Sequence, residues 1–299
     1  MSVGEHGPAQ PRWTPPRLSG AVAVVTGASR GAGRGIARVL GEAGATVYVT
    51  GRSVRGRPTT DGMAGTIDET AEEITARGGV GIPVRVDHTD DAQVEALFAR
   101  VRREQGRLDL LVNSAFGGNE RWIGGEPFWE QPTAHWEGMF TAGVRAYIIA
   151  SRYAVPLMLG HGRGLIAHVS YWDHDKYLGN LYYDLAKAAM NRMAYAMAQE
   201  LRPHGIAAVA LSPGWMRTER VLAHMEAGYH TPEDIAGIES VEYVGRAVAA
   251  LAADPALLDK AGRILVVAEM ARDYGFTDID GQQHGATTSD PDEQSFRAR

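Results

Sequence analysis

The chain contains no cysteine among its 299 residues. This absence excludes a disulfide framework, thiolate metal ligands and a cysteine nucleophile, and it is typical of a reducing compartment, so we expect a cytoplasmic protein. The sequence also lacks any apolar run of about 20 residues, which excludes a membrane-spanning helix of ordinary length. An excess of basic charge is missing too. The formal net charge is −6 and the pI is about 5.9, which does not favour a nucleic-acid partner.

Large apolar residues are scarce at both ends of the chain. Residues 1–19 are polar and proline-rich and lack the apolar core of a secretory signal, so we predict a flexible arm. Residues 283–299 have too little apolar content to pack and are predicted to form a flexible tail. Because α/β domains of roughly 200 to 250 residues are common, we expect residues 20–282 to form one domain.

Short apolar runs alternate with helical patterns through this domain. The predicted strands are 21–27, 45–51, 82–87, 108–114, 164–170, 206–212 and 262–268. The predicted helices are 33–43, 66–77, 91–105, 133–160, 182–202 and 241–253. Nearly continuous hydrophobic strands are typical of parallel sheets covered on both faces. The pattern therefore predicts an α/β fold with a doubly wound, seven-stranded parallel sheet of the Rossmann type in three α/β/α layers. Residues 214–240 interrupt it and form a candidate lid over the substrate.

The stretch "VVTGASRGAGRGIA" joins the first strand to the first helix. Its glycines permit a tight turn, and the helix N-terminus offers free N–H groups to a pyrophosphate. Two alternatives remain for this pattern alone, a glycine-rich turn without a ligand and an S-adenosylmethionine site. The predicted cofactor contacts in the turn are Gly27, Ser29, Arg30, Gly31, Ala32 and Gly33.

Arg52 stands at the end of the second strand, where NAD enzymes usually carry an acid that holds the ribose 2′-hydroxyl. Arg30 lies nearby in the glycine turn. Two guanidinium groups suit a doubly charged 2′-phosphate, so we expect NADP(H) in preference to NAD(H). The alternative is that Arg52 simply points into water.

The stretch "SYWDHDKYLGNLYYDLAKAA" contains four tyrosines, of which Tyr183 alone has a lysine four positions later, Lys187. Side chains four apart lie on the same face of a helix. An ammonium held there favours an ionised phenol, which suits proton transfer. This spacing is common on helices, so it needs support from the rest of the chain.

Several ordered motifs resemble those of the short-chain dehydrogenase/reductase family over residues 20–268. They are "TGASRGAG", "LVNSAFG" with Asn113 and Ala115, "YYDLAK", and "SPGWMRT" with Pro213, Gly214 and Thr218. Ser114 and Phe116 depart from the family pattern. The closing segments "GRAVAALAADP" and "ARDYGFTDIDG" resemble the subgroup of dehydrogenase/reductase family member 1.

The resemblance implies a carbonyl reductase, or the reverse reaction. Tyr183 would exchange a proton with the substrate oxygen. Lys187 and the positive nicotinamide of the oxidised cofactor would together lower the pKa of the tyrosine, and Lys187 would also bind the nicotinamide ribose. The remaining expected cofactor contacts are Asp87 at the adenine, Asn113 and Ala115 along the groove, Pro213 and Gly214 in their motif, and Thr218 at the carboxamide. From the residues alone, Asp87 could be an ordinary strand-ending acid, Asn113 a cap, and Thr218 an N-cap.

Two family roles lack an obvious holder. Counting back from Tyr183 places the substrate-binding serine at Ser170, whereas counting from Gly164 places it at Tyr171. Adjacent strand residues face opposite ways, so the choice matters, and a bulge could bring Ser170 round. In the family, an asparagine in the fourth helix helps to hold a water that relays protons from the lysine, and this position falls on Gly143, which has no side-chain amide. Three alternatives remain: the proton relay is built from other groups, catalysis is weaker, or the glycine allows close packing.

The expected substrate is a hydrophobic ketone or aldehyde, or the matching alcohol, because aromatic side chains gather near the predicted site. They are Phe116, Trp122, Phe128, Trp129, Trp172, Tyr177 and Trp215, with Met216 beside them. Relatives pair through helices at 133–160 and 182–202, which predicts a homodimer or homotetramer. No metal-binding spacing is present. The main rival hypothesis is a non-catalytic NADP-binding sensor, and a methyltransferase is the remote third.

Overall fold

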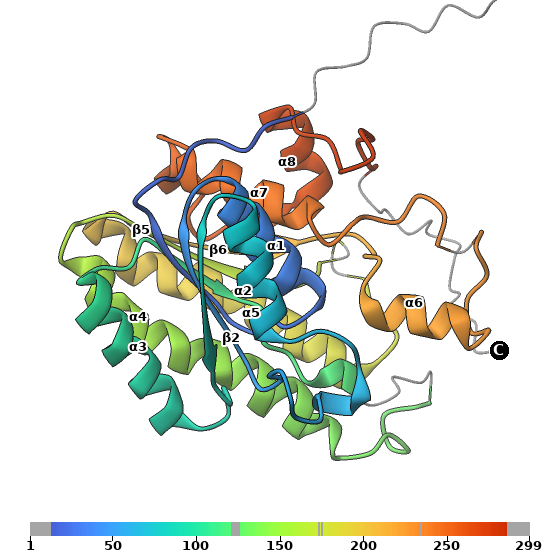
Figure 1. Ribbon diagram of the computed structural model, residues 1–299. Coiled ribbons are helices and arrows are strands. Elements are labelled where there is room, and N and C mark those ends of the chain that lie inside the picture. The colour runs from blue at the N-terminus through green and yellow to red at the C-terminus, as the bar shows by residue number, and fades with distance from the viewer. Residues whose placement is uncertain (1–12, 121–125, 173, 175, 234, 286–299) are drawn as a thin grey trace, which may run out of the picture.

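A seven-stranded, wholly parallel sheet forms the centre of the computed structural model, which describes residues 13–120, 126–172, 174, 176–233 and 235–285 (Figure 1). The strand order is β3-β2-β1-β4-β5-β6-β7. The strands are β1 (Val22–Val25), β2 (Thr46–Gly51), β3 (Val80–Arg85), β4 (Leu110–Asn113), β5 (Gly164–Val169), β6 (Ile206–Ser212) and β7 (Ile264–Val266). This order confirms the predicted doubly wound sheet.

Helices cover both faces of the sheet (Figure 1). On one face α1 packs against α2 and α7, and on the other α4 packs against α3 while α5 lies on β5 and β6. The α-helices are α1 (Gly31–Glu42), α2 (Ile67–Ala76), α3 (Asp91–Gln105), α4 (Ala146–Leu159), α5 (Leu181–Leu201), α6 (Glu219–Glu226), α7 (Tyr243–Ala253) and α8 (Val267–Tyr274). Short 3-10 turns are η1 (Thr60–Gly62), η2 (Gly118–Glu120), η4 (Arg202–His204) and η5 (Leu257–Lys260).

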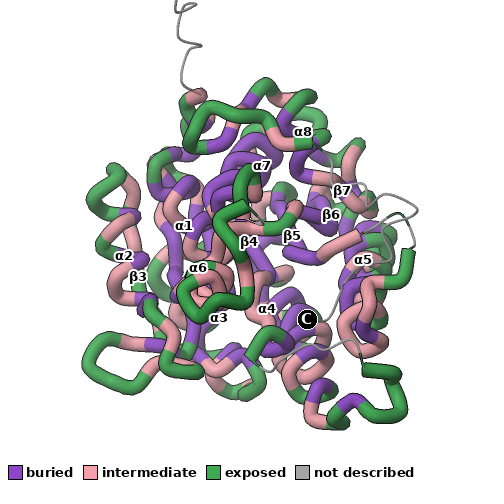
Figure 2. Tube along the Cα trace, turned by 90° about the vertical axis from the view of Figure 1, so that its right-hand side faces the viewer, coloured by how far each residue is buried: buried purple, intermediate pink, exposed green. Residues whose placement is uncertain are grey.

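The central strands are buried along their whole length, which Figure 2 shows as a continuous buried layer between the helices. Their residues are mainly valine, leucine, isoleucine and alanine, which pack well on a pleated surface covered from both sides. The start of α7 can approach α1 closely because Gly35 has no side chain. A Cβ at that position would lie 1.8 Å from the carbonyl oxygen of Val241, just before α7. The sheet thus holds its carboxyl edge, where the predicted site residues gather, on a rigid base.

The predicted lid at 214–240 is more ordered than a loop. It contains α6, whose N-cap Thr218 accepts a hydrogen bond from the Val221 amide. A parallel bridge between Met216 and Glu239 closes its base. Figure 1 shows α6 standing at the side of the sheet.

The predicted helix at 133–160 has two parts. Residues Glu137–Arg145 form π-helical turns, labelled η3, and α4 continues from Ala146. The Gly138 carbonyl accepts a hydrogen bond from the Gly117 amide outside the helix, which accompanies the wider turns. Such segments are frequent at functional sites.

Both terminal segments pack further than expected. Leu18 is buried, and the ring of Trp13 lies edge-on to Phe276, 5.9 Å between centroids. The part of the predicted arm that the structure describes is therefore attached to the domain, because Trp13 packs against Phe276 just after α8, a helix that the sequence pattern missed. Among the described residues, no helix is long and apolar enough to cross a membrane.

Candidate active site

The glycine turn packs tightly against the segment that follows β4. A Cβ on Gly27 would lie 2.7 Å from the Ala115 Cα, and one on Gly33 would lie 2.5 Å from the Gly27 carbonyl oxygen. The Thr26 hydroxyl accepts hydrogen bonds from the Ser114 and Ala115 amides at 2.9 and 3.0 Å. These contacts require glycine and set the start of α1 at the carboxyl edge of the sheet. Such a cradle fits a dinucleotide pyrophosphate.

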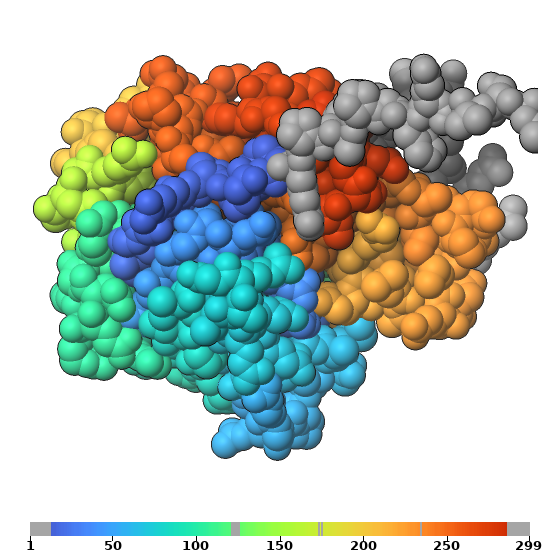
Figure 3. Space-filling model, turned by 45° about the horizontal axis from the view of Figure 1, so that its top comes forward, coloured from blue at the N-terminus to red at the C-terminus, as the bar shows by residue number. Residues whose placement is uncertain are grey.

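The first amide of α1 is engaged by a carboxylate from the lid. Gly31 donates a hydrogen bond of 2.7 Å to Glu219 Oε2, and Arg34 lies 3.8 Å from the other oxygen. Next to it, Arg220 pairs with Asp61 at 2.8 Å, so that the lid and the loop after β2 meet on the surface (Figure 3). Sequence reasoning missed Glu219, because nothing in its local pattern signals a contact 188 residues away.

The two arginines predicted at the 2′-phosphate differ in their surroundings. The Arg30 guanidinium donates to the Ser53 hydroxyl and to backbone carbonyls between residues 60 and 65. Its donors therefore fasten the loop after β2. Arg52 is more exposed and forms an ion pair with Glu120. Of the two, Arg52 is the one that directly follows the carboxyl end of β2.

Tyr183 and Lys187 lie one above the other in the first turns of α5. The helix begins at Asn180, whose side chain accepts a hydrogen bond from the Tyr183 amide. Lys187 is buried, and its Nζ lies 5.2 Å from the Tyr183 ring centroid and 4.2 Å from that of Phe116. The structure thus brings the predicted pair together on one helix face.

Burial dominates the pKa values of this pair. It raises the pKa of Tyr183, as does the nearby Tyr171, and it lowers the pKa of Lys187 to about 8. The predicted lowering of the pKa of Tyr183 needs Lys187 together with the positive nicotinamide of the oxidised cofactor, so it stays a prediction for the complex.

Ser170 and Tyr171 occupy different positions relative to this pair. The Ser170 hydroxyl is buried and donates to the Lys187 carbonyl oxygen at 3.2 Å. Tyr171 instead lines a small cavity together with Pro213 and Gly214. Of the two candidates for the serine role, Tyr171 is the one that borders open space.

The other predicted contacts are partly committed to the protein. Asn113 is wholly buried, with its amide nitrogen 3.1 Å from both the Ser151 hydroxyl and His168 Nδ1, so its side chain does not line the edge of the sheet. Asp87 accepts hydrogen bonds from the Thr89 amide and hydroxyl. Thr218 serves as the N-cap that the sequence allowed.

Glu239 is a buried acid that sequence reasoning missed. It lines the cavity beside Tyr171 and Gly214, and its Oε2 has no hydrogen-bond partner among the described residues. Burial raises the pKa of its carboxyl to about 7. A larger hollow, lined by Arg17 and Asp109 among others, lies at the amino ends of the strands, away from these residues.

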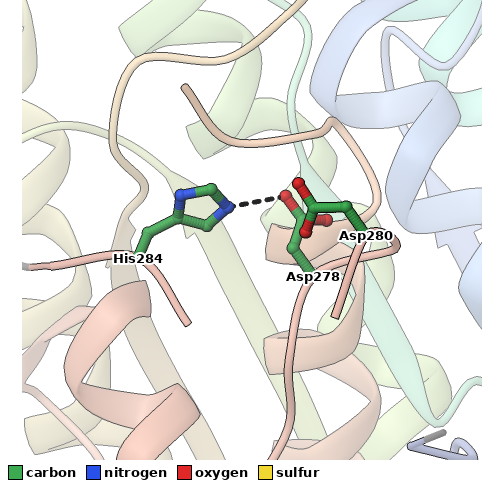
Figure 4. A group of neighbouring side chains, drawn as sticks. All are labelled: Asp278, Asp280 and His284. Atoms are coloured by element: carbon green, nitrogen blue, oxygen red, sulfur yellow. Dashed lines mark hydrogen bonds and ion pairs between the residues drawn. The ribbon is translucent and has the colours of Figure 1, made fainter. Parts of the chain in front are cut away.

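Asp278, Asp280 and His284 gather near the end of the described chain (Figure 4). Asp278 accepts hydrogen bonds from the amide and hydroxyl of Ser240, and His284 bridges it to the Gly237 carbonyl. The group thereby fastens the C-terminal segment to the base of the lid. Hydrogen bonds within the protein already satisfy the carboxylate of Asp278, so we assign the group of three residues a structural role.

Of the aromatic residues predicted around a pocket, Phe116 contacts the Tyr183–Lys187 pair. Phe128, Trp129, Tyr177 and Trp215 are exposed, whereas Trp172 and Met216 are half-buried. Trp122 lies outside the described residues. The predicted apolar lining is therefore found mainly as exposed rings around the edge of the sheet.

Comparison with known proteins places the chain among dehydrogenases. A family model described as short chain dehydrogenase matches residues 21–227. The chain is 41% identical to mouse, and 38% identical to human, dehydrogenase/reductase SDR family member 1, in each case over 89% of this chain and 85% of the relative.

Solved structures agree with these relatives. A short chain dehydrogenase of Mycobacterium thermoresistibile has a TM-score of 0.76 at 25% identity, covering 94% of this chain and 100% of that one. A hydroxysteroid dehydrogenase of Escherichia coli has a TM-score of 0.67 at 28% identity, covering 84% and 96%.

Proposed function

The chain belongs to the short-chain dehydrogenase/reductase family, and on this premise we propose an NADP(H)-dependent oxidoreductase that acts on hydrophobic ketones, aldehydes or secondary alcohols. The family and the Rossmann-type fold imply a nicotinamide cofactor. The observation that carries the proposal is the Tyr183–Lys187 pair, which lies at the same edge of the sheet as the glycine turn.

The nicotinamide, when bound, supplies or accepts the hydride. In the reduction, the Tyr183 hydroxyl donates its proton to the substrate oxygen, and in the oxidation the phenolate takes it back. Because burial raises the pKa of Tyr183 in the protein by itself, the neutral phenol is its resting form and is ready to act as an acid. Positive charge from the Lys187 ammonium and an oxidised cofactor together favour the phenolate in the reverse direction.

Arg52 supports NADP(H) over NAD(H). Its guanidinium lies at the end of β2, the strand whose carboxyl end usually carries the ribose-binding acid of NAD enzymes. Glu120 pairs with it in the structure, and a 2′-phosphate would compete for the same donors. Arg30 contributes indirectly, because it holds the loop after β2.

A hydrophobic substrate is supported by rings around the Tyr183 end of the edge. Phe116 contacts Tyr183, and Trp172 lines the small cavity beside Tyr171. Apolar walls with few polar groups select ligands by shape and leave one carbonyl for Tyr183 to recognise.

The test is turnover. A panel of cyclic and aromatic ketones is incubated with NADPH, and the matching alcohols with NADP⁺, while the absorbance of reduced cofactor is followed. Oxidation of NADPH by the parent chain, lost in Tyr183→Phe, supports the proposal. Failure of every compound while NADPH binds tightly contradicts it.

That second result would favour an NADP-binding sensor. One observation speaks for this candidate, because the Ser170 hydroxyl is tied to the Lys187 carbonyl and does not border the cavity. Limited proteolysis with and without NADPH distinguishes the two, since a sensor must change its shape with occupancy.

We further propose a homodimer or homotetramer built on α4 and α5. Exposed apolar side chains on these helices include Ile148, Leu159, Leu185 and Tyr195. Covering them with a second copy would remove apolar surface from water. Light scattering during gel filtration gives the mass in solution, and a monomer would contradict this assembly.

A further inference from the structure

Phe116 contacts both members of the Tyr183–Lys187 pair. The Lys187 Nζ lies 4.2 Å from the centroid of its ring. The Tyr183 ring meets it edge to face, with centroids 6.1 Å apart and planes at 77°. One aromatic side chain therefore touches the proposed acid and the lysine that serves it.

Two glycines form the slot that holds the Phe116 ring. A Cβ on Gly118 would lie 2.5 Å from ring atoms Cε1 and Cζ, and one on Gly143 would lie 2.9 Å from Cδ2. The Met190 methyl group closes the same side, 3.2 Å from the Gly143 Cβ position. Because a larger residue at either glycine would displace the ring, packing fixes its place.

The ring face is an electrostatic partner for the ammonium. A cation within about 6 Å of an aromatic centroid is attracted by the negative face of the ring. Lys187 is buried, and burial lowers its pKa to about 8. The ring opposes this loss of hydration, because it favours the charged form and gives it one preferred place.

We propose that Phe116 is a positioning residue, which holds the Lys187 ammonium over its ring face in a slot opened by Gly118 and Gly143. The inference rests on the proposed function for its catalytic meaning, since Lys187 acts there on Tyr183. The proposal also links Phe116 and Gly143, two positions at which the chain departs from the family pattern. The ring at position 116 fills the space that the missing side chain at position 143 leaves.

The test observes Lys187 directly. The chain has three lysines, Lys176, Lys187 and Lys260, so ε-13C-lysine labelling gives a spectrum with few signals that single substitutions assign. Ring currents shift the ε-methylene protons of a lysine that lies over an aromatic face. Titration of the same signals gives the pKa of Lys187 without any substrate.

The matched variants are Phe116→Leu, which keeps apolar bulk without a ring, and Phe116→Tyr, which keeps the ring. In Phe116→Leu we expect a smaller ring-current shift, because only the Tyr183 ring remains 5.2 Å from Lys187 Nζ. The Lys187 pKa should be lower by about half a unit to one unit. Phe116→Tyr should keep both values near those of the parent. If Phe116→Leu leaves the shift and the pKa unchanged, the proposal is overturned.

A second pair separates positioning from simple packing. Phe116→Ala removes the ring and also opens the slot to water, so the Lys187 pKa should fall less than in Phe116→Leu. Gly143→Ala displaces the ring without altering its chemistry, so both the ring-current shift and the pKa of Lys187 should differ from those of the parent. An unchanged ring-current shift of Lys187 in both Phe116→Ala and Gly143→Ala would contradict the proposal.

These measurements are independent of turnover. If they succeed while no ketone is reduced, the proposed function fails and the placement of Lys187 stands. Conversely, an active enzyme whose Lys187 ignores Phe116 would retain the function and lose this inference.

Discussion

Charged groups near the glycine turn have hydrogen-bonding or ion-pair partners within the protein, whereas the buried charge at α5 lies against an aromatic ring. Glu219 accepts from Gly31, and Arg52 pairs with Glu120. At α5, Lys187 faces Phe116. A ligand at the glycine turn must therefore displace partners within the protein. A ligand at α5 instead supplies interactions to buried groups that have lost their hydration. Binding energy and catalytic rate should depend on different residues.

The largest expected effect lies at α5. Tyr183→Phe removes the proton that the substrate oxygen needs, and we expect turnover to fall by about 10²- to 10⁴-fold. Affinity for NADPH should stay the same, because the charges around the glycine turn are untouched. Steady-state kinetics and fluorescence titration measure the two quantities, and a variant with parental turnover would break the comparison.

Charge reversal at the other region should change affinity instead. In Arg52→Asp we expect NADPH to bind about 10- to 100-fold more weakly, which corresponds to losing one or two charged hydrogen bonds. NADH binding should change little. The control is Arg100→Asp, which removes an exposed pair on α3. Equal losses for NADPH and NADH would contradict a 2′-phosphate contact.

A smaller effect of opposite sign is expected from the lid. Glu219→Gln removes a negative charge from the N-terminus of α1, so NADPH should bind about two- to fivefold more tightly. Glu226→Gln at the far end of α6 is the matched control. Titrations should find no gain in the control, and weaker binding in Glu219→Gln would show that the carboxylate helps the cofactor.

The smallest effect is expected at Ser170. Its hydroxyl donates to the Lys187 carbonyl, so Ser170→Ala should cost about 1 kcal/mol of unfolding free energy. Turnover should stay within about a factor of three. A drop of two orders of magnitude would instead restore the substrate-binding role that the sequence suggested. Thermal unfolding and kinetics on the same preparation supply both values.

The sequence predicted the fold better than the site. Nearly continuous apolar runs such as 206–212 predicted the strands, because a sheet covered on both faces needs that pattern. α8 was missed, since its pattern continues directly from β7 without a turn signal. The π-helical turns at Glu137–Arg145 were also missed, because residue spacing does not distinguish them from an α-helix.

Within the site, relations set by a local motif could be predicted from the sequence, whereas burial and long-range contacts could not. The four-residue spacing placed Tyr183 and Lys187 on one face, because helix geometry fixes that relation. The spacing said nothing of hydration, so the rise that burial causes in the pKa of Tyr183 could not be predicted from it. Asn113 was expected to line the cofactor groove, and the sequence could not tell that its side chain is buried, since a residue at the end of a strand can face either way.

The hydrogen bond from Gly31 to Glu219 has a consequence for the order of events in the molecule. Because Glu219 belongs to α6, the position of α6 is thermodynamically coupled to ligand binding at the N-terminus of α1. Whatever second molecule stabilises α6 away from α1 must strengthen dinucleotide binding, and by reciprocity the dinucleotide must strengthen that molecule's binding by the same factor.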